Sequence, residues 1–115
     1  MAQYMLLLRD DPSEWGKLSP EEMQKAMEKY REWRTRPFVV DGHQLDSRTG
    51  RVMAKKDDAV SVTDGPFSES REVLGGYYTI EAKDFDEAVK LTGDHPHIAI
   101  GTVEIREVMR MSEGG

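Results

Sequence analysis

The sequence predicts a single α+β domain in which two helices pack on one face of an antiparallel sheet. The chain has 115 residues, the usual length of one domain. Apolar residues run together or alternate in some segments, as in strands, and recur every three or four residues in two others, as in helices. The predicted order is strand, helix, strand, hairpin, strand, helix and strand. Without the hairpin, this is the split βαβ order of a ferredoxin-like fold.

The first predicted strand covers residues 3–9. Tyr4–Leu8 are five consecutive apolar residues between polar ones, and such a run indicates burial on both faces of a sheet. Residues 10–13 are predicted to form a loop because they read Asp-Asp-Pro-Ser. In that loop we expect the adjacent carboxylates of Asp10 and Asp11 to point to solvent.

The first predicted helix begins after Ser19. Ser19 can cap the helix, Pro20 suits the first helical position, and Glu22 completes a capping box. Pro37 disfavours helical geometry in the residue before it, so the helix should end near Arg36. One face of the helix carries an apolar stripe, which we interpret as core: Met23, Met27, Tyr30 and Trp33.

The rest of the chain alternates strands with turns and one further helix. A strand at 38–45, interrupted by Asp41-Gly42, precedes a hairpin whose arms are 51–54 and 59–63, with its turn at 55–58. After Gly75-Gly76, a strand is predicted at 77–82. The second helix starts at the capping box of Asp84 and Glu87 and stops at Gly93. The last strand is expected at about 101–109.

The predicted sheet has more apolar surface than one chain can cover. Right-handed crossovers place both helices on the same face of the sheet. The strands Tyr4–Leu8 and Tyr77–Ile80 are nevertheless apolar or aromatic on both faces, and a soluble monomer rarely exposes a large apolar patch. We therefore expect a homodimer in which the open sheet faces pack against each other.

Composition excludes several classes of protein. The chain contains no Cys, so neither a disulfide scaffold nor a Cys-based zinc site is possible. The net charge is −6, and no basic stripe provides the patch that nucleic-acid binding needs. No apolar run is long enough for a signal peptide or a membrane span. We expect a cytoplasmic protein that binds neither nucleic acid nor a membrane.

Three blocks of sequence resemble a known family. They are the segment Thr63–Glu72 with its Asp-Gly-Pro-Phe motif, the Leu-Gly-Gly-Tyr-Tyr segment at 74–78, and Pro96–Arg106. Together with the apolar first strand and the Leu-Ser-Pro-Glu-Glu helix start at 18–22, they resemble the YciI-like (YCII-related) family, in the branch named after the Asp-Gly-Pro-Phe motif. The resemblance covers nearly the whole chain.

The resemblance implies a dimeric α+β barrel but no defined reaction. Some YciI-like proteins carry a His–Asp pair proposed as an acid/base dyad, with the His on the first helix. Here the stretch Pro20–Arg36 contains no His. Members of this branch also occur near, or fused to, sigma factors of the extracytoplasmic-function type, which implies a regulatory context.

The loop that follows the hairpin contains most of the candidate site residues. Asp64 follows a strand and precedes Gly65 and Pro66, so its carboxylate could act as a general base or bind a ligand. The alternative is a structural Asp at a tight turn. Arg71 could anchor an anionic ligand, or instead form an ion pair. The same loop supplies further ligand-binding candidates, namely Gly65, Phe67 and Glu69.

Two histidines flank Pro96. A single His acting as acid or base suits neutral pH. We favour His97 for that role because it lies in the block that resembles the family, with His95 as a ligand-binding candidate. The alternative for His97 is a hydrogen bond to a neighbouring subunit. A His-X-His pair could also bind a metal, but Pro96 disturbs that geometry and no third ligand is evident, so we predict no metal and no cofactor.

Two functions remain open from the sequence. The first is a non-catalytic dimeric module that binds a small molecule or a regulatory partner such as a sigma factor. The second is a cofactor-free enzyme in which Asp64 and His97 catalyse elimination or isomerisation of a small anionic or phenolic substrate.

Overall fold

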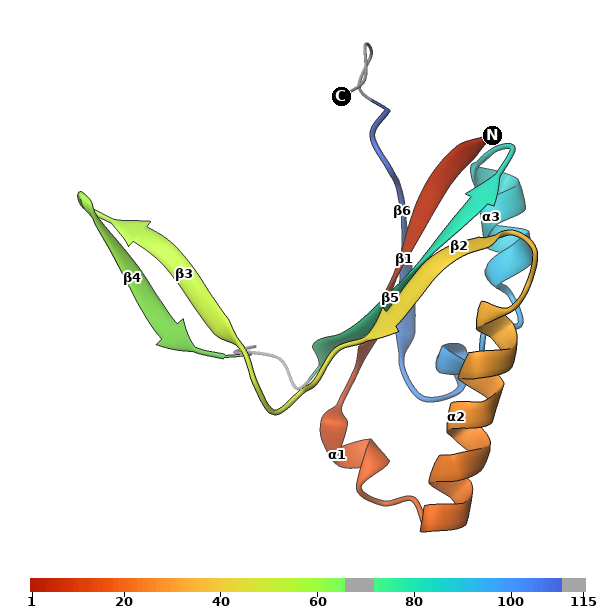
Figure 1. Ribbon diagram of the computed structural model, residues 1–115, viewed down its shortest axis with the longest axis horizontal. Helices are drawn as coiled ribbons and strands as arrows, with labels where there is room; N and C mark the ends of the chain where they lie inside the picture. Colours follow the sequence, from red (N-terminus) through yellow and green to blue (C-terminus); the bar gives the residue numbers. More distant parts are fainter. Residues whose placement is uncertain (66–71, 111–115) are drawn as a thin grey trace.

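A four-stranded antiparallel sheet forms the centre of the molecule. The structure is a computed structural model, and it describes residues 1–65 and 72–110. The sheet order is β2-β5-β1-β6, and every neighbouring pair is antiparallel (Figure 1). This is the order of a ferredoxin-like fold, as predicted. The strands are β1 (Ala2–Asp10), β2 (Val39–Gln44), β5 (Val73–Ala82) and β6 (Thr102–Glu107).

The helices cover one face of this sheet, as predicted from crossover handedness (Figure 1). The long helix α2 begins at the expected capping box, in which Ser19 and Glu22 exchange hydrogen bonds. Two short helices were not predicted, because four residues are too few to show a helical period. The helices are α1 (Pro12–Trp15), α2 (Pro20–Arg34), α3 (Phe85–Thr92) and the 3₁₀ helix η1 (Pro96–Ala99).

The core lies between the helices and one face of the sheet. Along β1, buried residues alternate with half-buried ones, so that only one face of the strand reaches the core. Trp33 of α2 is 1% exposed and packs edge-on against Tyr78 of β5. The core cluster consists of Tyr4, Leu6, Leu8, Trp33, Tyr78, Ile80, Ala82 and Ala88.

The C-terminal end of α2 is tied to the segment that precedes η1. The indole Nε1 of Trp33 donates to Asp94 at 3.0 Å, and Arg36 donates to both oxygens of the same carboxylate at 2.9 and 2.7 Å. These hydrogen bonds lower the pKa of Asp94, with the bond from Trp33 contributing most. They hold η1 beside α2, and this fixes the position of the two histidines of η1.

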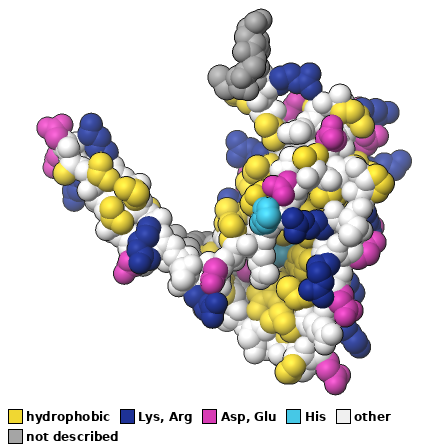
Figure 2. Space-filling view, in the orientation of Figure 1, with side chains coloured by type: hydrophobic (Ala, Val, Ile, Leu, Met, Phe, Trp, Pro, Cys, Tyr) yellow, Lys and Arg dark blue, Asp and Glu magenta, His cyan; other side chains and the backbone are white. Residues whose placement is uncertain are grey.

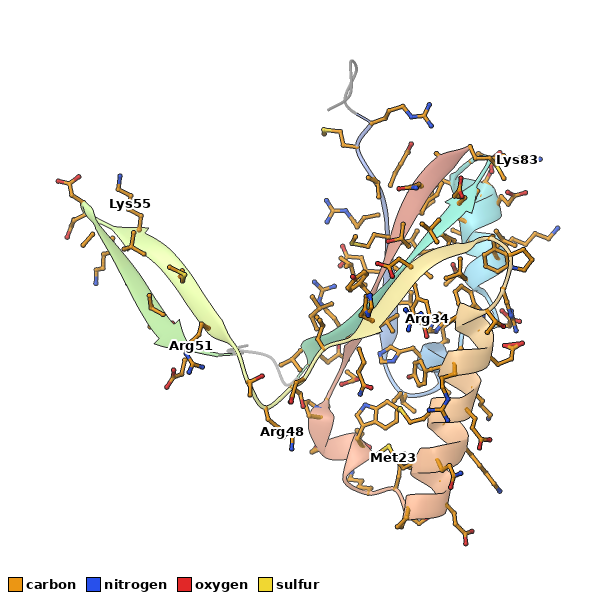
Figure 3. All side chains as sticks on the ribbon, viewed as in Figure 1. Met23, Arg34, Arg48, Arg51, Lys55 and Lys83 are labelled. Atoms are coloured by element: carbon orange, nitrogen blue, oxygen red, sulfur yellow. The ribbon has the colours of Figure 1, made fainter. Side chains whose placement is uncertain are left out.

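The hairpin β3 (Arg51–Lys56) and β4 (Ala59–Asp64) forms a separate two-stranded sheet. It projects away from the body of the molecule, with Arg51 near its base and Lys55 near its tip (Figures 1 and 3). Its two-residue turn contains Asp57 in the left-handed conformation, at φ 57°. Four large apolar side chains of the hairpin are exposed: Val52, Met53, Val60 and Val62.

The second face of the main sheet is only partly covered. Met5 and Leu7 of β1 and Tyr77 of β5 are half-buried, whereas their neighbours on the core face are buried. The predicted burial of β1 on both faces is therefore not achieved within one chain. Among the described residues, no helix has the length and apolar character that crossing a membrane requires.

Candidate functional site

A cavity of about 320 Å³ lies between α1, the N-terminal part of α2 and the sheet. It is visible as a hollow with hydrophobic side chains inside (Figure 2). Figure 3 shows Met23 on the side of α2 that faces α1. Met23 and Met27, expected as core filling, line this cavity instead. The other lining residues that the structure describes are Leu8, Asp10, Pro12, Trp15, Tyr30, His43, Gln44, Leu45, Ser47, Gly75, Gly76, Tyr78 and His97.

The carboxylate of Asp10 is buried at the inner end of this cavity. Its side chain is 8% exposed, and its Oδ2 accepts a hydrogen bond from Nε1 of Trp15 at 3.0 Å. The expectation that Asp10 points to solvent is therefore wrong. The strand β1 extends through Asp10, and alternation places residues 4, 6, 8 and 10 on the same, helix-covered face.

His97 is held by hydrogen bonds from both ring nitrogens. Its Nε2 lies 2.9 Å from the carbonyl oxygen of Arg9, and its Nδ1 lies 2.7 Å from the hydroxyl of Tyr30. A carbonyl can only accept, so Nε2 must carry the proton. In the neutral ring, Nδ1 then accepts from the Tyr30 hydroxyl. Both ring nitrogens of His97 thus contact groups of its own chain, and the residue is 2% exposed.

Asp10, His97 and Tyr30 form one buried polar cluster. Nε2 of His97 lies 3.6 Å from Oδ2 of Asp10, close enough for charge interaction but longer than a hydrogen bond. Burial, with a further contribution from the charge of Asp10, raises the pKa of Tyr30 well above its usual value. Tyr30 therefore remains a protonated hydrogen-bond donor at neutral pH. The cluster joins residues from β1, α2 and η1.

His95 faces the core rather than the cavity. Its Nδ1 accepts from the backbone N–H of His97 at 3.0 Å, which caps η1. Its ring packs against Trp33 and Tyr78, with centroids at 4.5 and 4.7 Å. Nε2 has no hydrogen-bond partner among the residues that the structure describes. Burial, followed by the charge of His97, lowers the pKa of His95 to about 4.

Gly101 allows the backbone of β1 to approach His97. A Cβ at this position would lie 2.1 Å from the carbonyl oxygen of Arg9 and 2.8 Å from Nε2 of His97. No side chain fits into that space, so only glycine permits the hydrogen bond between these two groups. At Gly76 a Cβ would lie 3.0 Å from the carbonyl oxygen of His43, whereas on Gly75 it would lie at an ordinary 3.4 Å from Oδ2 of Asp10.

Of the residues proposed from sequence, the structure places His97 in the cavity wall. Asp64 lies on the projecting hairpin, where its side chain is 86% exposed and lies 3.4 Å from Arg51. Gly65 follows it and donates its N–H to the carbonyl of Gly50. The structure thus does not bring Asp64 to the cavity that contains His97. Three further candidates lie outside the described residues: Phe67, Glu69 and Arg71.

Sequence reasoning missed Asp10, Trp15 and Tyr30 as site residues. For Asp10, the signal was present in the two-residue period of the first strand, since the apolar positions 4, 6 and 8 continue to position 10. Tyr30 was assigned to the apolar stripe of α2, and nothing in that stripe separates a wall residue from a core residue. Within residues 1–65 and 72–110, no group of three potential ligands lies close enough to hold a metal ion.

Comparison with known proteins identifies the family of the chain and a solved structure with a similar fold. A model of the YCII-related domain matches residues 2–112 of the chain. No curated protein matches it. Among solved structures, it is similar to 5-chloro-2-hydroxyhydroquinone dehydrochlorinase from Burkholderia phenoliruptrix AC1100, in complex with 2,5-dihydroxybenzoquinone. The TM-score is 0.52 at 10% identity, with 98% of this chain and 99% of that chain covered. At this identity the similarity shows a shared fold.

Proposed function

This chain belongs to the YCII-related family, and from that premise we propose that it binds a small, largely apolar molecule in the cavity beside α2. The observation that carries the proposal is the buried carboxylate of Asp10, which lines an otherwise mainly apolar cavity next to His97. A concave apolar site with a few convergent polar groups is the usual form of a small-molecule site.

Stability alone gives no reason for these polar groups to be buried here. Burying a carboxylate costs several kcal/mol, on the order of what a buried ion pair recovers. An apolar side chain in place of Asp10 would fill the space without that cost. Asp10 is therefore better explained as a group that meets a ligand, with His97 and Tyr30 forming the polar surroundings of its carboxylate.

Fragment binding followed by NMR tests this proposal. Small aromatic fragments should shift the amide signals of Gly75 and Gly76 and the indole signal of Trp15, because these groups line the cavity. The substitution Met27→Trp should fill part of the cavity and weaken fragment binding. Met53→Trp, on the exposed hairpin, is the matched control. Unchanged binding to Met27→Trp, or shifts confined to other surfaces, would contradict the proposal.

A second candidate function is acid/base catalysis without a cofactor. The observation that favours it is the contact between Asp10 and His97, a His–Asp pair built from β1 and η1 rather than from the first helix. Both ring nitrogens of His97 already face protein groups. Asp10 is therefore the better candidate for the base that takes a proton from a substrate, and His97 and Tyr30 would stabilise its charge.

A substrate screen tests the catalytic candidate. Small phenols and halogenated aromatic compounds are suitable first substrates, because the structurally similar dehydrochlorinase acts on such a compound. Asp10→Asn should abolish any turnover found, and Asp64→Asn, on the hairpin, should retain it. Turnover that survives Asp10→Asn would remove Asp10 from the mechanism.

We also propose that the protein is a homodimer formed through the open sheet face. Met5, Leu7 and Tyr77 supply a half-buried apolar centre on that face. Charged residues of the edge strand β6 border it on one side, and a polar rim is typical of protein interfaces. A link to sigma factors stays a prediction from the family resemblance.

A further inference from the structure

We propose that the ligand of this cavity is a small organic amine whose ammonium group pairs with the carboxylate of Asp10. The inference rests on the proposed function, since it names the class of molecule that the cavity binds. Three features of the cavity support it. One oxygen of Asp10 accepts no hydrogen bond from the described residues, the described lining residues include no unpaired cation, and part of the wall is aromatic.

The first feature is the unequal use of the two oxygens of Asp10. Trp15 donates to Oδ2, and Nε2 of His97 also lies nearest to Oδ2, at 3.6 Å. In the described part of the chain, no hydrogen bond reaches Oδ1, and Oδ1 is not among the fully buried atoms that lack a partner, so it is accessible. An accessible carboxylate oxygen that has no protein donor can accept a hydrogen bond from a donor on the ligand.

The second feature is the charge of the cavity wall. No Lys or Arg is among the cavity-lining residues that the structure describes. If His97 is neutral, the buried side chains of the cavity carry one negative charge, that of Asp10. If His97 is protonated, their net charge is zero. In neither state does a ligand carboxylate meet an unpaired cation. Arg34 lies outside the wall, is half exposed, and approaches Asp41 at 4.0 Å.

The third feature is the wall around Asp10. Trp15 and Tyr30 lie side by side, with ring centroids 6.0 Å apart, and Tyr78 continues the wall on the sheet. The thioethers of Met23 and Met27 complete an apolar, adaptable surface. Such walls suit the hydrocarbon part of an amine.

Three ligands of similar shape but different charge test whether the cavity prefers an amine. Benzylamine, benzyl alcohol and benzoate carry a positive, zero and negative charge at pH 7 on the same ring. We expect benzylamine to bind at least about tenfold more tightly than benzoate, because one buried unit charge is worth that much. Benzyl alcohol should fall between them. Binding is measured by NMR titration, with the indole signal of Trp15 as the reporter.

Asp10→Asn should remove the preference, since the amide keeps the shape of the side chain and loses its charge. Asp58→Asn, at the turn of the hairpin, changes the net charge equally and should leave the preference intact. The order of the three ligands on the unaltered protein requires no variant, so the inference stays testable even if Asp10→Asn does not fold.

The outcomes for the amine and for the cavity are distinct. If cavity signals respond to benzoate or benzyl alcohol as strongly as to benzylamine, the proposal of an amine ligand is wrong. The proposal that the cavity binds a small molecule then still stands. If cavity signals respond to other fragments and not to benzylamine, the amine is also wrong. If no fragment of any charge shifts them, the proposed function itself fails, and the amine fails with it.

Discussion

The hydroxyl of Tyr30 lies 2.7 Å from Nδ1 of His97, although the two residues are 67 positions apart in the sequence. This contact joins the long helix α2 to the short helix η1. The carbonyl oxygen of Arg9 places the proton on Nε2 of His97, so Nδ1 of the neutral ring accepts from Tyr30. The orientation of the ring beside Asp10 thus depends on both contacts.

Tyr30→Phe should lower the free energy of unfolding by about 1–3 kcal/mol, because it leaves the buried Nδ1 of His97 without its donor. Urea denaturation measures the change. The matched control is Tyr77→Phe, since Tyr77 is half-buried on the open face and its hydroxyl reaches Asp41 only at 3.4 Å. Equal effects of the two substitutions would show that the Tyr30 contact contributes nothing specific.

Gly101→Ala should destabilise the protein by about 1–3 kcal/mol, as expected for overpacking. The added Cβ would lie 2.1 Å from the carbonyl oxygen of Arg9, so the backbone of β1 or the ring of His97 must move. Gly16→Ala is the control, because its backbone is helical and its Cβ would meet Ser13 at an ordinary 3.5 Å. A Gly101→Ala protein as stable as the control would contradict the observed close approach.

The stability of the protein should fall as the pH is lowered from about 6.5 to 4 through the titration of His95. Burial lowers the pKa of His95 from 6.5 to about 4 in the folded state. In this window the unfolded chain binds a proton that the folded chain does not, so the free energy of unfolding rises with pH. One such group contributes at most about 1.4 kcal/mol per pH unit.

His95→Asn isolates this effect, because the Asn side chain can still cap η1 but does not titrate. Urea denaturation at several pH values should give a smaller slope for His95→Asn than for the unaltered protein. His43→Asn should leave the slope unchanged, because the side chain of His43 is 54% exposed. An unaltered slope in His95→Asn would mean that His95 titrates normally.

Leu7→Lys should convert the proposed dimer into a monomer without unfolding it. A charge in the centre of the open sheet face cannot be buried between two copies without a partner. Light scattering at micromolar concentration should give the mass of two chains for the unaltered protein and of one chain, 13.1 kDa, for the variant. Val89→Lys, on the exposed side of α3, is the control. A monomer mass for the unaltered protein would rule out the dimer.

The sequence predicts the elements well where local chemistry determines them. The sequence motifs at Ser19 and Asp84 mark the starts of α2 and α3, and both helices begin there. Ser19 and Glu22 form a full capping box, whereas Glu87 accepts from the N–H of Lys83 rather than from that of Asp84. The hairpin arms follow from alternating residues on either side of a charged turn. The end of β1 was placed one residue early, at Arg9, because Asp10 looked like a loop residue by composition.

The candidate site was only partly predictable, for a different reason. His97 was selected because it lies in the block that resembles the family, whereas Asp10 and Tyr30 can be recognised as site residues only from the residues that surround them in the fold. Asp64, chosen for its place at a tight turn, lies on the hairpin. No local sequence pattern indicates that the end of β1, the middle of α2 and η1 lie next to one another in the fold.

By itself, the sequence determined the order of strands and helices, their capped ends and the mainly apolar character of two strand faces. These features depend on hydrogen bonds and spacings within a few residues. The tertiary structure decided that Asp10 is buried, that Met23 and Met27 line a cavity, and that His97 bonds to Tyr30 and Arg9. Such contacts depend on how the helices pack on the sheet, because packing alone brings distant residues within hydrogen-bond distance.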